Sequence, residues 1–205
     1  MWRCLEGGGV RPLPGAVPAP LLGGAALLAL AGCVAPEGAG QAAPVRPPAE
    51  AVLARLPATA AGFDRFGTQD VAADDPGAGK VVEYATPRRV AVAQVFLYDL
   101  GRPLVTAADL PAETERAVQE ATALPVDRTG RQLSVASRSP LAVPGGDFSC
   151  AALSGTFGRN QVERQVCLGV VAGRFMRVQV TMPGRAAALA DPRAFVGAVA
   201  AAARG

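Results

Sequence analysis

The chain contains no histidine, few aromatic residues and almost no excess of charge. Of its 205 residues, 20 are Lys or Arg and 17 are Asp or Glu, which gives a formal net charge of +3, and only 5% are aromatic. Histidine is the commonest general base and metal ligand, and a nucleic-acid surface needs a clear excess of positive charge. The composition therefore argues against histidine-dependent catalysis, a histidine-ligated metal and nucleic-acid binding, and we expect no cofactor and no metal.

The N-terminal part lacks an apolar run long enough to cross a bilayer. Residues 21–32 form an apolar run of 12 residues that ends at Cys33, whereas a membrane-spanning helix needs about 20 residues. A run of this length behind positively charged residues is typical of a secretory signal. We predict a signal peptide over residues 1–32, with Val10 as an alternative start because the preceding nine residues include an acid and a glycine triplet.

The run ends in Leu30-Ala31-Gly32-Cys33, which resembles the lipobox of bacterial lipoproteins. The resemblance implies cleavage between Gly32 and Cys33 and acylation of Cys33, for instance with palmitate. Each methylene buried in lipid contributes about 0.8 kcal/mol, so two or three acyl chains make a stable anchor. We expect an anchored protein of the bacterial cell envelope that faces the periplasm, and Val34, which is not the retention aspartate of enterobacterial lipoproteins, favours the outer membrane. The alternative is a short buried helix with an incidental cysteine.

The mature chain divides into a tether and one folded domain. Residues 33–58 are rich in Pro, Ala and Gly, a composition typical of a semi-extended spacer, with a short helix expected at 49–56 before Pro57. We predict a single domain over residues 59–205.

Alternating apolar and polar residues predict strands in this domain, together with two helices. In residues 90–99 both faces are largely apolar, which predicts a central strand covered on both sides. The result is an α+β fold: an antiparallel sheet of about five to seven strands flanked by helices, with a C-terminal helix packed on the sheet. The expected strands are 63–70, 80–85, 90–99, 132–143, 148–157, 164–171 and 174–182, and the expected helices are 109–124 and 191–203.

The order of these elements over residues 60–204 resembles PsbP, the extrinsic photosystem subunit, and its bacterial relatives. The resemblance implies an antiparallel sheet flanked by helices that serves as an assembly or interaction module.

The four cysteines have different expected fates. Cys4 is removed with the signal peptide and Cys33 is lipidated, which leaves Cys150 and Cys167 in an exported protein. They lie on neighbouring expected strands, where a tight turn would place them opposite each other. We predict a structural disulfide. The alternative is a redox-active pair, against which the lack of a Cys-x-x-Cys spacing and of histidine argues.

Charge is distributed unevenly along the chain. Residues 60–127 have a net charge of −5 and residues 150–205 a net charge of +5. The second region predicts a basic patch suited to an anionic partner, such as lipid headgroups or an acidic protein. The simpler alternative is a solvated face that pairs with the chain's own acidic half. The patch would consist of Arg159, Arg164, Arg174 and Arg177.

The sequence contains no recognisable activated nucleophile and no phosphate-binding loop. We therefore expect a lipid-anchored, non-catalytic binding or envelope-assembly module with a protein partner in the envelope. The first alternative is a carrier of a small apolar ligand, which a closed cavity would favour. The second, less favoured, is an enzyme, which a cleft joining Tyr84, Tyr98 and Asp99 would indicate.

Overall fold

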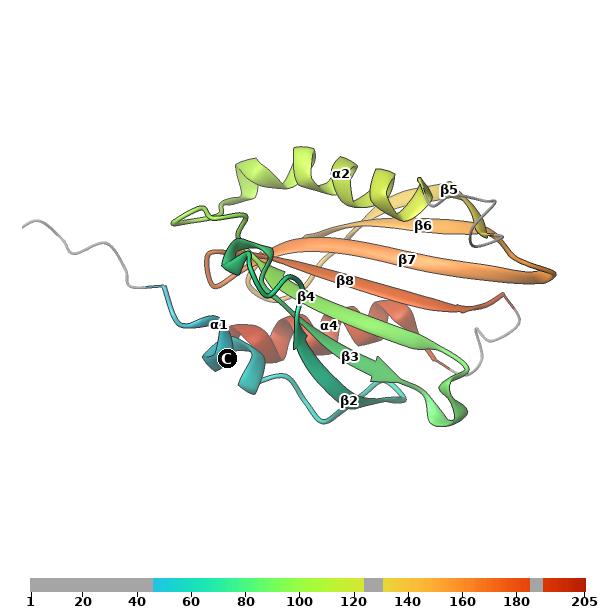
Figure 1. Ribbon diagram of the computed structural model, residues 1–205, viewed down its shortest axis with the longest axis horizontal. Helices are drawn as coiled ribbons and strands as arrows, with labels where there is room; N and C mark the ends of the chain where they lie inside the picture. The colour runs from blue at the N-terminus through green and yellow to red at the C-terminus, as the bar shows by residue number, and fades with distance from the viewer. Residues whose placement is uncertain (1–45, 124–130, 185–189) are drawn as a thin grey trace, which may run out of the picture. The chain divides into compact units, whose positions relative to one another are not determined.

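An antiparallel sheet of eight strands forms the centre of the structure (Figure 1). The computed structural model describes residues 46–123, 131–184 and 190–205; the predicted signal peptide, the lipobox, most of the tether and the predicted helix end at Leu124 lie outside these residues. In the sheet the strands follow the order β1-β2-β3-β4-β8-β7-β6-β5. They comprise β1 (Thr59–Ala60), β2 (Phe63–Asp70), β3 (Lys80–Ala85), β4 (Val92–Tyr98), β5 (Arg131–Leu141), β6 (Phe148–Phe157), β7 (Asn160–Val171) and β8 (Arg174–Pro183).

The predicted α+β class with an antiparallel sheet is confirmed, but the predicted count of five to seven strands is wrong. The additional strand is β1, which pairs with β2 through Thr59 and Ala60 only. Two residues are too few to show the alternation by which strands are recognised in a sequence.

Helices lie on both faces of the sheet (Figure 1). One face carries α2 (Leu110–Thr122), and the other carries α1 (Ala49–Ala54) and α4 (Pro192–Arg204). At the start of α4 the Asp191 side chain accepts hydrogen bonds from the amides of Arg193 and Ala194, so it satisfies two of the free N–H groups of the first turn. The predicted C-terminal helix packed on the sheet is confirmed. The shorter 3₁₀ turns are η1 (Pro76–Ala78), η2 (Pro87–Arg89) and η3 (Ala107–Asp109).

The largest apolar cluster lies between the sheet and α4. Phe195 of α4 is fully buried, and its ring centroid lies 4.8 Å from that of Phe63 and 5.1 Å from that of Tyr84. Phe148, Met176 and many smaller residues complete the cluster. Since the chain is poor in aromatic residues, this grouping concentrates a large share of its bulky side chains on one face of the sheet.

The short helix α1 also belongs to this core. Val52 and Leu53 are buried against the cluster, and the Pro57 carbonyl accepts a hydrogen bond of 2.8 Å from the Tyr84 hydroxyl. The sequence predicts a helix at 49–56, which is found, but assigns it to the end of the tether. Three of its eight residues are alanine, and alanine is also frequent in the spacer before it, so composition does not separate the two.

The chain is fixed to the domain even before α1. Arg46 forms an ion pair of 2.8 Å with Asp99 and donates hydrogen bonds to the carbonyls of Arg102 and Gly173, and Arg174 donates to the Pro47 carbonyl at 2.6 Å. The chain therefore enters the domain beside the hairpin turn that joins β7 and β8. No helix within the described part of the chain is both long and apolar enough to cross a membrane.

A substitution in α1 tests whether this helix is part of the folded domain. We expect Leu53→Ala to lower the free energy of unfolding by about 2–4 kcal/mol, because it leaves a cavity among buried neighbours. Leu104→Ala, the same truncation at a leucine that is 56% exposed, should change it by less than about 0.5 kcal/mol. Urea denaturation followed by circular dichroism measures both. Equal effects of the two substitutions would show that α1 is not packed.

Candidate functional site

The predicted disulfide is present. Cys150 of β6 and Cys167 of β7 are opposite each other in the strand register and are joined by a bond between their Sγ atoms. Both residues are buried on the face of the sheet that packs against α4. Burial among apolar side chains keeps reductants and other thiols away from the sulfur atoms, which fits a structural bond and not a redox-active pair.

The four arginines of the predicted basic patch do not lie on one exposed surface. Arg174 and Arg177 are both buried, at 7% and 8% exposure. Arg174 lies 3.7 Å from Asp99, and Arg177 donates a hydrogen bond of 2.6 Å to Glu120. These two arginines thus pair with carboxylates of the acidic half of the chain, as the simpler alternative expected.

The other two arginines lie farther along the sheet. Arg159 is exposed in the turn between β6 and β7, and Arg164 of β7 donates a hydrogen bond of 2.9 Å to the hydroxyl of Thr181 on β8. In β7 the strand partner of Arg177 is Leu168, four residues beyond Arg164. The predicted patch is therefore split between two buried, paired residues near one end of the sheet and two residues near the other.

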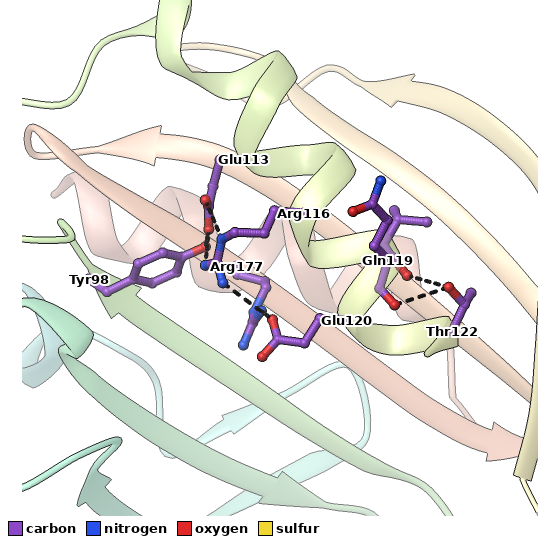
Figure 2. Close-up of polar contacts among 8 residues, drawn as sticks. Tyr98, Glu113, Arg116, Gln119, Glu120, Thr122 and Arg177 are labelled. Carbon is purple, nitrogen blue, oxygen red and sulfur yellow. Dashed lines mark hydrogen bonds and ion pairs between the residues drawn. The ribbon is translucent and has the colours of Figure 1, made fainter. Parts of the chain in front are cut away.

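A cluster of polar side chains fastens α2 to the sheet (Figure 2). The hydroxyl of Tyr98 donates to the Glu113 carboxylate, and the Arg116 Nε donates to the same carboxylate at 2.8 Å. The Arg177 guanidinium lies over the ring of Phe96, at 4.3 Å from its centroid, where the negative face of the ring attracts the cation. We call Tyr98, Glu113, Arg116, Glu120 and Arg177 the α2 polar cluster.

The environment of the α2 polar cluster changes the proton affinity of its members. Burial disfavours ionisation of Glu113, but the hydrogen bonds from Arg116 and Tyr98 outweigh this effect, so the pKa of Glu113 lies below its ordinary value. Burial and the bond to Glu113 raise the pKa of the Tyr98 hydroxyl. The hydrogen bond to Glu113 also raises the pKa of Arg116. At neutral pH the cluster therefore holds a neutral tyrosine and fixed ion pairs.

Tyr84, Tyr98 and Asp99 do not form a common cleft. Tyr84 is buried in the core on the α4 side, whereas Tyr98 contacts Glu113 of α2 on the opposite face of the sheet. Asp99 is engaged with Arg46 and Arg174 at the end of β4. Within the described residues, there is also no group of three or more His, Cys, Asp or Glu side chains that could hold a metal ion.

An open groove crosses the end of the sheet that is distant from Arg46. Its volume is about 1110 Å³, and its walls come from the start of β4, the end of β8, the start of β7 and the turn between β6 and β7. We refer to this feature as the groove. It is lined by Arg89, Val90, Val92, Leu133, Phe157, Arg159, Asn160, Gln161, Val162, Glu163, Arg164, Thr181, Met182, Pro183 and Gly184.

The groove combines exposed apolar side chains with positive charge. Val90, Val92 and Phe157 are 37%, 39% and 46% exposed, respectively, although a strand such as β4 with two apolar faces was expected to be covered on both sides. β4 is central, as predicted, but no helix of the described residues covers its first residues. Several large apolar side chains that are exposed in one groove are typical of interaction surfaces. The strand periodicity predicts this exposed surface only in part. It shows that a face of the strand is apolar, but it does not show whether another element covers that face.

Comparisons with known proteins add only a fold resemblance. No protein-family model and no curated protein sequence matches the chain. Its structure resembles the solution structure of cyanobacterial PsbP (CyanoP) from Synechocystis sp. PCC 6803, with a TM-score of 0.36 and 14% identity over 63% of this chain and 85% of that one. The weak resemblance to PsbP inferred from the element order is thus also found between the structures. At this level of similarity it says nothing about function.

The ion pairs of Glu113 predict a defined pH dependence of stability. Because the pKa of Glu113 is lowered by folding, its contribution is present above its ordinary value of 4.5 and is lost as the pH falls through the lower value of the folded state. We expect Glu113→Gln to cost about 1–3 kcal/mol at pH 7 and to flatten the decline in stability in acid below pH 4.5. Thermal unfolding between pH 7 and pH 3 measures this difference.

The matched control is Glu115→Gln in the same helix. Glu115 pairs with Arg138, but both side chains are about half exposed, so this substitution should have little effect at either pH. Indistinguishable pH profiles for the two variants would contradict the role assigned to Glu113.

Proposed function

We propose that this chain is a lipid-anchored lipoprotein of the bacterial cell envelope, facing the periplasm, whose α+β domain acts as a non-catalytic binding or assembly module. The anchor is supported by the apolar run that ends in Leu30-Ala31-Gly32-Cys33. Export is supported by the disulfide between Cys150 and Cys167, since such bonds persist mainly in oxidising compartments.

The observation that carries the binding role is the groove. Three of its lining side chains, Val90, Val92 and Phe157, are large, apolar and at least 37% exposed. They come from the start of β4 and the residues just before it and from the end of β6, so folding brings together residues that are distant in the sequence. A patch that remains apolar and exposed in the folded chain favours contact with a partner.

The position of the groove suits a protein held by an N-terminal anchor. β7 runs for 12 residues from Asn160 in the groove to Val171 beside the turn that binds Arg46, a distance of about 40 Å. The groove therefore lies at the far end of the sheet from Arg46, where the chain enters the domain.

The two alternatives have less support. A carrier of a small apolar ligand needs space inside the fold, but Phe63, Tyr84 and Phe195 are in ring contact between the sheet and α4, and the groove is open. An enzyme of the kind considered above needs Tyr98 and Asp99 near Tyr84, which lies on the other face of the sheet.

The anchor is tested by changing Cys33. We expect the wild-type chain, produced in a bacterium with labelled palmitate, to incorporate the label and to sediment with membranes, and Cys33→Ser to do neither. Cys4→Ser is the matched control, because it removes a cysteine that the predicted cleavage discards. Separation of inner and outer membranes on a density gradient tests the expected outer-membrane location. An unlabelled wild-type chain, or a labelled Cys33→Ser chain, would contradict the anchor.

The binding role is tested by the size of the particle that contains the chain. We expect the wild type, extracted from membranes with mild detergent, to migrate in native electrophoresis as a complex larger than the monomer. Phe157→Ser should shift it to the monomer, because it removes a large exposed apolar side chain from the binding surface. Leu104→Ser, at a residue outside the groove that is slightly more exposed than Phe157, should leave the complex intact. A monomeric wild type would contradict the proposed function.

A further inference from the structure

We infer that the groove binds an extended, acidic segment of a partner protein in which carboxylate side chains are interspersed with apolar ones. This inference rests on the proposed function as a binding module and names the chemistry of its partner. It follows from three properties of the groove: the placement of its charges, the placement of its apolar side chains, and its openness.

Positive charge lines both rims of the groove. Arg89 precedes β4 on one side, and Arg159 lies in the turn between β6 and β7 on the other. The guanidinium of Arg89 lies over the ring of Phe66, 4.9 Å from its centroid, and the negative face of the ring attracts it. Arg159 is exposed, and the one carboxylate in the described lining is that of Glu163. The charge at the two rims is therefore complementary to an anionic occupant.

Apolar side chains lie beside the arginine at each rim of the groove. Val90 and Val92 lie beside Arg89, and Phe157 lies two residues before Arg159. Between them the floor crosses β7 and β8 and includes the polar pair Arg164 and Thr181. An occupant that lies across the strands therefore meets an arginine and apolar side chains at each rim, with polar groups in between.

This pattern favours a peptide segment over a lipid. An acyl chain gains affinity by being removed from water, and sites for small apolar ligands enclose most of the ligand surface. The groove is open, and polar side chains such as Asn160, Gln161 and Thr181 interrupt its apolar surface. An extended peptide places side chains of different kind at regular intervals and offers backbone groups to polar neighbours. A peptide can therefore contact the arginines and apolar side chains of both rims and form hydrogen bonds with the polar floor at the same time.

Fluorescence anisotropy with synthetic peptides tests the inference. The probe is a labelled 12-residue peptide that alternates Glu with Val and Phe, added to the full lipidated chain in phosphatidylcholine nanodiscs. One control peptide has Lys in place of every Glu, and another has Ser in place of every apolar residue. We expect the acidic apolar peptide to bind at least about tenfold more tightly than either control, because only this peptide matches both the charge and the apolar surface. Its affinity should fall as the salt concentration rises.

Variants of the rim arginines show whether binding occurs in the groove. Arg89→Glu and Arg159→Glu should each weaken binding of the acidic peptide by about fivefold or more, since each replaces an attraction with a repulsion. The matched control is Arg193→Glu, which makes the same change of charge at the start of α4, outside the groove, and should leave binding unchanged. Unchanged thermal unfolding of all three variants confirms that they are folded.

Several outcomes would overturn the inference. These are equal binding of the Lys peptide, no effect of Arg89→Glu and Arg159→Glu, or tighter binding to phosphatidylglycerol vesicles or to decanoate than to the peptide, which would assign the groove to lipids. Native electrophoresis of the wild type separates this failure from that of the proposed function. A chain that forms the larger complex but does not bind the acidic peptide retains its binding role and loses only the stated partner chemistry.

Discussion

The pairing of β4 with β8 is the contact on which the whole architecture depends. Strands β1 to β4 and strands β5 to β8 each pair with their neighbours in the chain, and only the β4–β8 pair joins the two sets. Seven residue pairs, from Val92 opposite Thr181 to Tyr98 opposite Phe175, form this junction. At one end of it the rings of Tyr98 and Phe175 lie 5.4 Å apart, and at the other end lies the groove. Neither the α2 polar cluster nor the groove would exist without it.

Different interactions hold the helices on the two faces of the sheet. On the α4 side, aromatic rings, the disulfide and the helices α1 and α4 form a continuous apolar core. On the α2 side the apolar contacts form two smaller clusters, one that includes Ala117 and Leu153 and one that includes Leu168 and Phe175. The α2 polar cluster supplies directional bonds in addition. A buried carboxylate like that of Glu113 is tolerated because Tyr98 and Arg116 both donate to it. The first face thus contributes most of the stability, and the second fixes how α2 is oriented.

Local patterns in the sequence predict most of the helices and strands. They do not predict the tertiary contacts between these elements. Alternation predicted the strands, the Asp191-Pro192 pair predicted the start of α4, and a tight turn after β6 correctly placed Cys150 opposite Cys167. The two-residue strand β1 is too short for such patterns, and they predict the helix α1 but not its burial in the core, because that depends on tertiary contacts. The same holds for the arginines: nothing local to Arg177 shows that Phe96 and Glu120 surround it.

The groove is a consequence of the different lengths of helices and strands. An α-helix advances 1.5 Å per residue and a strand about 3.3 Å, so the 13 residues of α2 span about 20 Å, whereas the 12 residues of β7 span about 40 Å. α2 lies along β6 and β7 near the end of the sheet where Tyr98 binds Glu113 (Figure 1). One helix of this length covers about half of the strands beneath it. On the opposite face α1 supplements α4, but in the described residues no second helix supplements α2. The uncovered half contains Val92 and Phe157, and the exposure of these residues is therefore set by the architecture.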